Sequence, residues 1–480
     1  MRGWEIAEVA WPRDIPAAVQ DFGGRDEFAW LDSAAGLPGD VADERFSLIC
    51  ARPCALLEQF DGQPARLAID GGTQLEDASG WRLWRTALSR LPRPPRCAFG
   101  LAPGWVGYVG FEMARQLERL PCSHQDDFGL PWLRLALFER GIVLDHRHHR
   151  AFALHAPSIR PALGLSARPD PAADWMARWQ TAATARRTLV RPRDLRLSFE
   201  IDSAAHQRAV ARALDYIAAG DIYQVNLAQR LRLEGCLDPL STYLAVRRSN
   251  PAPYAALLQW PEGAVASVSP ELFLRLRGGA ALTCPIKGTR PRTGDPVLDE
   301  IGRQELLNSA KDAAELTMIV DLHRNDLGRV CQYGSVRVVQ PRRIETHPTV
   351  FHTVADIVGE LRPERDALDL LSACFPAGSV TGVPKIRAMQ IIDELEPVAR
   401  GVYTGAIGVL GLDGALTFNV AIRTLQMRGE TATLYVGGGI VADSDPAAEY
   451  DETLAKARGI LAGLLESAPA AAPAGSSAST

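Results

Sequence analysis

Lys287 has the most unusual chemical setting of the charged residues in the sequence. It follows the apolar stretch AALTCPI, which is predicted to be a strand, and precedes Gly288 and Thr289, where the chain must turn. A lysine beside buried surface has a lowered pKa, and the neutral amine that results is a nucleophile. A lysine in a loop is more often a solvated cation, so both interpretations stay open. Glu271, in SVSPELFLRL, is either a partner in an ion pair or a carboxyl that transfers a proton.

Two predicted helices carry carboxylates that a metal ion could share. Glu449 and Glu452 stand three residues apart, hence on one face, in a helix expected over about residues 446–465. Glu315 lies in another helix expected over residues 299–320. If the helices converge, their carboxylates would suit Mg²⁺, a hard cation often held by one or two carboxylates together with substrate oxygens. On spacing alone, a solvated acidic face is the simpler explanation for each helix.

A predicted strand, ALTFNVAIRTLQM, places Arg423 on its more polar face together with Thr417. The nearby Gly437, Gly438 and Gly439 have no Cβ atoms, so their backbone N–H groups can approach an anion closely. An arginine beside such a glycine run is suited to holding a carboxylate. Alternatively, the glycines mark a β-bulge and Arg423 pairs with a neighbouring acid.

Antiparallel strands are expected to position these residues. Three strand patterns separated by Asp-Gly and Arg-Gly turns are adjacent in the sequence, namely TGAIGVLGL, ALTFNVAIRTLQM and ATLYVGGGIV. A further strand pattern, IYQVNLAQRLRL, follows a helix that Asp202 or Ser203 begins and Gly220 ends. Strand-rich stretches interleaved with helices predict an α/β (α+β) protein built on antiparallel sheets. No strand leads into GxGxxG and no GxxxxGK[ST] occurs, which excludes a doubly wound nucleotide-binding fold.

Composition and charge are those of an ordinary globular protein. Of the 480 residues 47% are apolar, and 52 basic against 57 acidic residues leave a net charge of −5, which argues against nucleic-acid binding. No stretch approaches the ~20 apolar residues that a transmembrane helix needs, and the acidic residues near the N-terminus do not suit a signal peptide. The eight scattered cysteines form no CxxC pair, so we expect reduced thiols and a cytoplasmic location.

Two shifts in composition divide the chain. Residues 155–195 are rich in proline and arginine, and the last fifteen residues consist mainly of alanine, serine, proline and glycine. We therefore expect an N-terminal segment over residues 1–154 and a connection over residues 155–195. The main domain is expected over residues 196–465, and a disordered tail over residues 466–480.

Seven motifs, in order over about residues 200–460, resemble those of the chorismate-utilising enzymes: SPELF, PIKGTRPR, AELTMIVDLHRNDLGRVC, GSVTGVPKIRAMQIIDELEP, YTGAIG, FNVAIRT and VGGGIVADSDPAAEYDETLAKA. The group includes anthranilate synthase component I, aminodeoxychorismate synthase component I, and the isochorismate and salicylate synthases. The resemblance implies a four-layer sandwich of two antiparallel β-sheets flanked by helices, with the active site between the sheets. Residues 196–465 would then be the chorismate-binding catalytic domain, and the N-terminal WLDSAAG segment is similar to the same enzymes more loosely.

The resemblance also implies roles for the candidate residues. Glu315 and Glu452 look like the Mg²⁺ ligands, with Glu449 as a further or water-mediated ligand. Chorismate has two carboxylates, of which Mg²⁺ would hold the ring carboxylate, while Arg423 and Tyr403 would hold the enolpyruvyl carboxylate. Further contacts around the substrate are implied for Gly288, Thr289, Thr381, Gly437, Gly438 and Gly439.

Lys287 distinguishes the branches of this family. Anthranilate synthases carry PIAGT where this chain has PIKGT, and a lysine there resembles the aminodeoxychorismate synthases. The implied reaction is attack by Lys287 on C2 of chorismate while Glu271 protonates the departing 4-hydroxyl. Ammonia then adds at C4 and expels the lysine, giving 4-amino-4-deoxychorismate for p-aminobenzoate and folate biosynthesis. The isochorismate and salicylate branch has a lysine near the position of Gln224, which argues against water as the nucleophile.

Two alternatives remain, and both keep the fold. The first is an anthranilate synthase component I, which would aminate chorismate at C2. The second belongs to a different class and is a non-catalytic sensor of aromatic ligands. Such a sensor predicts eroded catalytic positions, whereas Glu271, Lys287 and Arg423 are all present.

A partner and a second ligand are also implied. None of the cysteines lies in a GxCxG nucleophile elbow, so ammonia is expected from solution or from a separate glutamine amidotransferase subunit. Ser33, Pro253 and Tyr254 resemble the tryptophan pocket of the family, in which tryptophan is either an inhibitor or a structural ligand.

Overall fold

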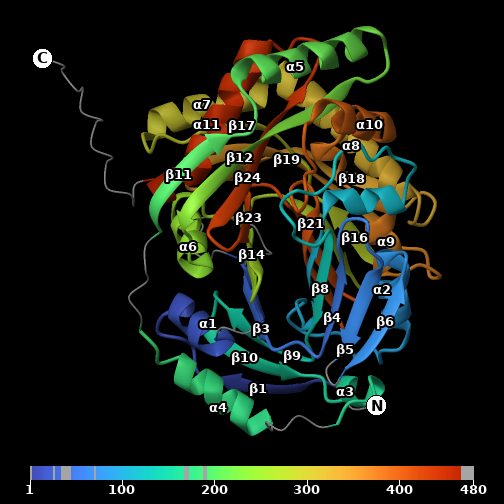
Figure 1. Cartoon of the computed structure of the whole chain (residues 1–480), viewed down its shortest axis with the longest axis vertical. Coiled ribbons are helices and arrows are strands. Elements are labelled where there is room, and N and C mark those ends of the chain that lie inside the picture. Colours follow the sequence, from blue (N-terminus) through green and yellow to red (C-terminus); the bar gives the residue numbers. More distant parts are fainter. Residues whose placement is uncertain are drawn as a thin grey trace, which may run out of the picture.

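Two large antiparallel β-sheets flanked by helices make up the protein (Figure 1). The computed structural model describes residues 3–24, 27–33, 45–69, 72–166, 172–186 and 192–465, and each sheet has twelve strands within those ranges. The predicted fold class is therefore confirmed. None of the helices in these ranges is long and apolar enough to cross a membrane. All eight cysteines are free thiols.

The first sheet, sheet A, combines strands from both ends of the chain. In spatial order its strands are β1 (Glu5–Val9), β10 (Arg150–His155), β9 (Arg140–Asp145), β3 (Phe46–Ala51), β2 (Phe28–Asp32), β13 (Tyr254–Trp260), β14 (Gly263–Ser269), β23 (Thr424–Arg428), β24 (Thr431–Ile440), β12 (Gln224–Cys236) and β11 (Arg193–Phe199), with β20 (Gly382–Val383) beside β12. The strand predicted from IYQVNLAQRLRL is β12. N-terminal β2 pairs directly with β13.

The second sheet, sheet B, is mixed in the same way. In spatial order its strands are β17 (Ile286–Pro291), β19 (Val350–Glu360), β16 (Ala280–Thr283), β15 (Leu272–Arg277), β22 (Leu416–Val420), β21 (Ala406–Gly411), β7 (Gly104–Val109), β8 (Leu133–Leu137), β4 (Ala55–Gln59), β5 (Ala65–Ile69) and β6 (Thr73–Asp77), with β18 (Arg337–Thr346) beside β19. Because β7 pairs with β21, strands from residues 1–154 and from residues 196–465 share both sheets.

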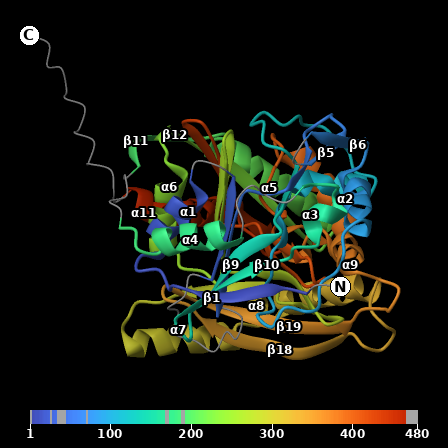
Figure 2. The same cartoon turned by 90° about the horizontal axis from the view of Figure 1, so that it is seen from below.

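Helices cover the two sheets. The α-helices are α1 (Ile15–Gly23), α2 (Gly80–Ser89), α3 (Ile159–Ala162), α4 (Ala172–Ala182), α5 (Ser203–Ala218), α6 (Pro239–Ser249), α7 (Pro296–Asn308), α8 (Ala310–Gly328), α9 (Ala367–Cys374), α10 (Lys385–Leu395) and α11 (Pro446–Leu465), and two 3₁₀ helices are η1 (Phe111–Gln116) and η2 (Gly378–Val380). Helices α5, α6 and α11 contact strands of sheet A. Helices α7 and α8 contact β17 and β19 of sheet B, and lie beside them in Figure 2. The helices predicted after Asp202 and from Pro446 are α5 and α11.

The described residues of the proline- and arginine-rich connection form regular elements. Residues 155–195 contain α3, α4 and the start of β11. Trp175 and Trp179 of α4 are buried, and their rings lie 5.9 and 5.4 Å from the ring of Phe22 in α1. The connection therefore contributes to the core beside sheet A. The predicted disordered tail, residues 466–480, lies outside the described residues.

The prediction of a single strand containing Arg423 is wrong. ALTFNVAIRTLQM forms two strands, β22 in sheet B and β23 in sheet A, and the chain crosses between the sheets over residues 421–423. Arg423 lies in this crossing with a φ of 50°, a left-handed conformation that a regular strand cannot contain. The hydrophobic alternation continues across the crossing because both sheets bury their inner faces. Alternation alone therefore could not locate the break.

The helix predicted over residues 299–320 is also two helices, α7 and α8. They meet at Ser309, which has an extended backbone and accepts a hydrogen bond from the N–H of Asp312 at 3.1 Å. This is an N-cap, which satisfies one of the free donors at the start of a helix. The cap sets where α8 begins and hence where Glu315, in its second turn, lies.

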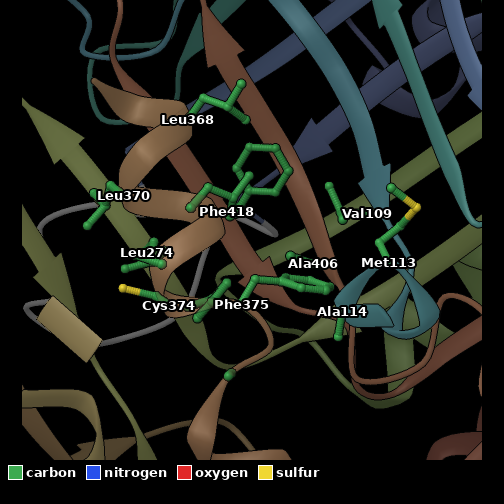
Figure 3. Packing of buried hydrophobic residues seen from close by; sticks show 14 of the residues in the cluster. Val109, Met113, Ala114, Leu274, Leu368, Leu370, Cys374, Phe375, Ala406 and Phe418 are labelled. Carbon is green, nitrogen blue, oxygen red and sulfur yellow. The ribbon is translucent and has the colours of Figure 1, made fainter. Parts of the chain in front are cut away.

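Apolar packing fixes each sheet and joins the two. Phe418 of β22 and Leu274 of β15 belong to one buried cluster with Leu368 of α9 (Figure 3). A separate cluster contains Tyr108 of β7 together with Val265 of β14, and so spans both sheets. Burying one such large side chain contributes about 1.5–3 kcal/mol. The separation of the sheets is therefore set by close packing.

Ser309→Ala removes the N-cap of α8. The free energy of unfolding should fall by about 1 kcal/mol, the usual cost of losing a serine cap, as measured by urea denaturation. Ser309→Asp retains a capping oxygen and places a negative charge at the helix N-terminus, so it should unfold like the wild type. Equal destabilisation by both substitutions would show that the cap does not stabilise α8.

Candidate active site

Lys287 lies on β17, and the strand forms a β-bulge directly after it. Lys287 pairs with Thr353 of β19, and the register shifts before the next pair, Thr289 with His352. Gly288 lies between them with a φ of 79°, and a Cβ atom there would stand 2.9 Å from Leu306 Cδ1. The bulge needs glycine for both reasons. It places Lys287 and Thr289 at a kink inside β17. The prediction of one strand over AALTCPI that ends at Lys287 is wrong, because that stretch is divided between β16, which ends at Thr283, and β17, which continues past Gly288.

Ser379 connects Lys287 to Glu271. The Lys287 ammonium donates to the backbone oxygen of Ser379 at 3.2 Å. The hydroxyl of the same serine donates to Oε1 of Glu271 at 2.5 Å. Glu271 stands just before β15 and is 3% exposed, so its carboxyl is shielded from bulk water. The structure thus brings the predicted nucleophile and the predicted acid to one residue of η2.

Burial changes the ionisation of both groups. Loss of water raises the pKa of Glu271 to about 7, although the hydrogen bond from Ser379 and the charge of Lys287 oppose this shift. Burial lowers the pKa of Lys287, although the carboxylates of Glu315 and Glu271 oppose this. Each shift favours the neutral form of its group. A neutral carboxyl can donate a proton near pH 7, and a neutral amine can attack carbon.

The glycine run lies across from Lys287, on sheet A. Gly439 of β24 pairs with Asn226 of β12, and a Cβ atom at Gly439 would stand 3.5 Å from Lys287 Nζ. The same atom would stand 2.5 Å from Nε2 of Gln224. Gln224 is fully buried, and within the described residues neither of its amide atoms has a hydrogen-bond partner. The absence of a Cβ atom at Gly439 therefore lets the backbone of sheet A approach Lys287 and Gln224 closely.

Arg423 lies near His352, and Tyr403 lies beside the glycine run. Burial lowers the pKa of Arg423 to about 10. Burial also lowers the pKa of His352, and the charge of Arg423 lowers it further. The Nδ1 of His352 is 2.9 Å from the hydroxyl of Thr289, which links Arg423 to the bulge after Lys287. The hydroxyl of Tyr403 would be 3.0 Å from a Cβ atom at Gly437, so a larger residue at position 437 would crowd that hydroxyl.

Thr381 is buried and already bonded. Its hydroxyl donates to the backbone oxygens of Ala377 at 3.2 Å and Gly378 at 3.4 Å, and its own backbone oxygen accepts from the N–H of Asn226 at 2.8 Å. It therefore fixes the segment after η2 against β12. A direct contact between its hydroxyl and a substrate stays a prediction.

The three predicted metal ligands lie in the neighbourhood of Lys287 and the glycine run: Glu315 and Glu452 act on the charge of Lys287, and Oε2 of Glu449 would stand 2.9 Å from a Cβ atom at Gly438. Glu315 of α8 and Glu449 of α11 have raised pKa values, chiefly through burial. The carboxylate of Glu449 raises the pKa of Glu315 further, and the carboxylate of Glu452 raises that of Glu449. Glu449 accepts from the Ser444 hydroxyl at 2.6 Å, and Glu452 pairs with Lys456 at 2.7 Å. Among the described residues no three His, Cys, Asp or Glu side chains are grouped as metal ligands.

Ser33, Pro253 and Tyr254 line a separate cavity. It measures about 70 Å³ and lies where β2 and the start of β13 approach β21 and β22. The N–H of Ser33 donates to the hydroxyl of Ser47 at 3.1 Å. A cavity of this size is well below the roughly 300 Å³ of an ordinary ligand site. The three residues are brought together as the resemblance implied, and tryptophan binding stays a prediction.

Two residues of the site were not identified from the sequence. Ser379 lies inside the GSVTG motif, but a serine in a loop gives no sign that it will bridge an acid and a lysine. His352 lies in β19 and is 2% exposed. Other polar residues, Thr353 and Asp356, lie in the same strand, so the sequence pattern did not single it out.

Glu271→Gln should reduce the pH dependence of stability. The raised pKa of Glu271 means that the folded protein holds this proton more tightly than the unfolded chain. The associated stability is fully present below the ordinary pKa of 4.5 and is lost as the pH rises through about 7. Between pH 5 and pH 8 the wild type should lose about 2–3 kcal/mol from this group, and the variant should not. Urea denaturation at both values tests this, and identical pH profiles would contradict it.

Comparison with known proteins identifies the family. The family described as chorismate binding enzyme matches residues 40–462. Aminodeoxychorismate synthase component 1 of Klebsiella aerogenes is 38% identical over 88% of this chain and 90% of its own length. Anthranilate synthase component 1 of Streptomyces coelicolor is also 38% identical, over 91% of this chain and 84% of its own length. The crystal structure of anthranilate synthase component I from Streptococcus pneumoniae TIGR4 matches with a TM-score of 0.75 and 29% identity, and the match covers 87% of this chain and 92% of that one. The chain therefore belongs to the chorismate binding enzymes.

Proposed function

We propose that this enzyme aminates chorismate at C4 and forms 4-amino-4-deoxychorismate. The observation that carries the proposal is the pairing of Lys287 with Glu271 through Ser379. Membership of the family supports chorismate as the substrate. The relatives do not decide the product, because aminodeoxychorismate and anthranilate synthases are equally similar to this chain. The chemistry of Lys287 is therefore the basis for choosing between the two.

The first step forms a covalent adduct. The neutral amine of Lys287 attacks C2 of chorismate, both ring double bonds shift (C1=C2 to C6=C1, and C5=C6 to C4=C5), and the C4–O bond breaks. Glu271 gives its proton to the departing hydroxyl, which leaves as water. Burial supports both roles, because it raises the pKa of the acid to about 7 and lowers the pKa of the amine.

The second step releases the lysine. Ammonia attacks C4, both ring double bonds return to their original positions, and the C2–N bond breaks, so that Lys287, a secondary ammonium in the adduct, leaves as a neutral amine. The new C4 ammonium gives one proton to the Glu271 carboxylate, which restores the acid. The sum is chorismate plus ammonia giving 4-amino-4-deoxychorismate plus water. With alanine in place of Lys287, ammonia would have to attack C2 directly, which is the route to anthranilate.

Two groups of residues are proposed to hold the two carboxylates of chorismate. Arg423 and Tyr403 suit the enolpyruvyl carboxylate, since a half-buried guanidinium, partly shielded from water, attracts an anion. Backbone N–H groups near Gly437, Gly438 and Gly439 can approach the substrate because no Cβ atoms intervene.

Mg²⁺ is proposed as the cation for the ring carboxylate. Glu315, Glu449 and Glu452 supply the oxygen donors that Mg²⁺ prefers, and their mutual repulsion would be relieved by a dication. When bound, the ion would add positive charge at the ring carboxylate. Glu449 and Glu452 would first have to leave Ser444 and Lys456, with which they are bonded.

Ammonia is proposed to come from a glutamine amidotransferase subunit. The name "component 1" carried by the Klebsiella aerogenes and Streptomyces coelicolor relatives is consistent with a second component in each of those enzymes. Nothing in the Lys287 chemistry requires the partner, since free ammonia would serve the same step. A tryptophan ligand at Ser33, Pro253 and Tyr254 would require that cavity to widen.

Lys287→Ala should abolish formation of 4-amino-4-deoxychorismate. The purified wild type and the variant are incubated with chorismate, Mg²⁺ and ammonium, and the position of the amino group is identified by chromatography and mass spectrometry. The wild type should carry nitrogen at C4. The variant should make no such product or turn to anthranilate. Anthranilate from the wild type, or an unaffected variant, would refute the proposed role of Lys287.

Glu315→Gln should weaken Mg²⁺ binding, because it removes a charged oxygen donor. Calorimetric titration with Mg²⁺ should show at least about a tenfold rise in the dissociation constant, by analogy with the cost of altering a metal's supporting shell. Glu76→Gln serves as the control, since Glu76 lies on edge strand β6 and pairs only with Arg66 among the described ion pairs. Equal Mg²⁺ affinity in all three proteins would contradict the assignment.

A further inference from the structure

Arg400 connects several segments of the candidate active site. It lies between α10 and β21 and is 1% exposed. Its guanidinium donates to the backbone oxygens of Asn226 at 2.7 Å and Val380 at 3.2 Å, and to the hydroxyl of Thr404 at 3.1 Å. It also donates to both carboxylate oxygens of Glu396, at 2.5 and 2.8 Å. Each nitrogen of the planar fork therefore has a partner.

Each segment that Arg400 contacts carries or adjoins a residue of the site. Val380 precedes Thr381 and follows Ser379, the residue that joins Lys287 and Glu271. Asn226 pairs with Gly439 across sheet A. Thr404 follows Tyr403, and the guanidinium carbon lies 5.6 Å from the centre of the Tyr403 ring. One side chain thus sets the relative positions of η2, β12 and the Tyr403 loop.

The N-terminal part of the chain also contacts Arg400, through residues of η1. Oε1 of Glu112, in η1, accepts from the backbone N–H of Arg400 at 2.8 Å. The neighbouring Phe111 donates its N–H to the oxygen of Gly401 at 2.8 Å, and the Arg400 guanidinium carbon lies 4.8 Å from the centre of the Phe111 ring. Oε1 of Glu396 also accepts from the N–H of Ala228 at 2.8 Å. The buried ion pair is therefore fully bonded, as a buried charge must be.

We propose that Arg400 is a positioning residue for chorismate binding. It has no contact with Lys287 or Glu271, and it acts by fixing the distance between the Ser379–Thr381 segment and the wall formed by Tyr403 and Gly439. The inference depends on the proposed use of chorismate. Lysine cannot replace arginine here, because its single ammonium has three donors and cannot span three segments in one plane.

The positioning role of Arg400 is tested with Arg400→Lys, and Arg134→Lys serves as the control. Arg134 is a matched control, because it is 5% exposed and its ion pairs with Glu27 and Glu58 involve none of the candidate site residues. Both variants should melt at a lower temperature than the wild type. Only Arg400→Lys should raise KM for chorismate, with kcat/KM falling by about 100-fold, as expected when substrate-positioning groups move by about 1 Å. Chorismate affinity measured by the quenching of protein fluorescence should fall in parallel.

The outcomes separate the two proposals. If the wild type neither binds nor consumes chorismate, the proposed function fails and this inference fails with it. If the wild type does both and Arg400→Lys keeps its chorismate KM while losing the same thermal stability as Arg134→Lys, only the inference is overturned. If Arg400→Lys does not fold, Thr404→Ala removes one of the arginine's partners. That variant should raise KM by about fivefold, the effect of one lost hydrogen bond, and an unchanged KM would overturn the inference.

Discussion

Lys287 and Glu271 are brought together by one residue, Ser379, and the rest of the site depends on that contact. The serine is held on η2 and offers its backbone oxygen to the amine and its hydroxyl to the carboxyl. Glu271 is buried and Lys287 is half-buried, and loss of water pushes each toward its neutral form. An amine and a carboxylic acid in that state are a nucleophile and a proton donor side by side.

The two sheets supply opposite halves of the site, and this explains how the chain is arranged. Lys287 and Glu271 come from sheet B, whereas Gly439 and Gln224 come from sheet A. The chain passes from one sheet to the other at Arg423, whose left-handed backbone makes the crossing. A crossing at this place puts a half-buried cation where the chain passes between the sheets. Strands from the N-terminal part extend both sheets, and Glu112 reaches Arg400 from that side. The N-terminal part of the chain therefore helps to hold Arg400, and through it the segments of the candidate active site that Arg400 contacts.

The local features of the fold were predictable because they depend on neighbouring residues. The capping residue and apolar stripe of α5, the proline at the start of α11 and the alternation in β12 all correspond to structure. The breaks were not predictable. Ser309 separates α7 from α8 although helical periodicity continues through it, and the crossing at Arg423 interrupts a pattern that suits either sheet. The positions of such breaks depend on which strands and helices each segment packs against in the folded protein.

The same distinction applies to the site. Lys287 and Gly288 were recognisable because a lysine at the end of an apolar strand, followed by glycine, is chemically unusual in sequence alone. Ser379 and Arg400 were not recognisable as part of the site. Their importance lies in contacts with residues that are distant in the sequence, such as Glu271 and Asn226. The family resemblance supplied roles for the carboxylates, which spacing could not distinguish from a solvated helix face.

Intact-protein mass spectrometry tests the central claim, that Lys287 becomes bonded to the substrate, most directly. The enzyme is mixed with chorismate and Mg²⁺ without ammonia, quenched with acid within one turnover, and digested to locate any modification. A protein heavier by chorismate less one water, with the added mass on the peptide containing Lys287, is the result that the account predicts. Amination of chorismate at C4 with no such adduct would contradict it, because the lysine would then act without forming a bond.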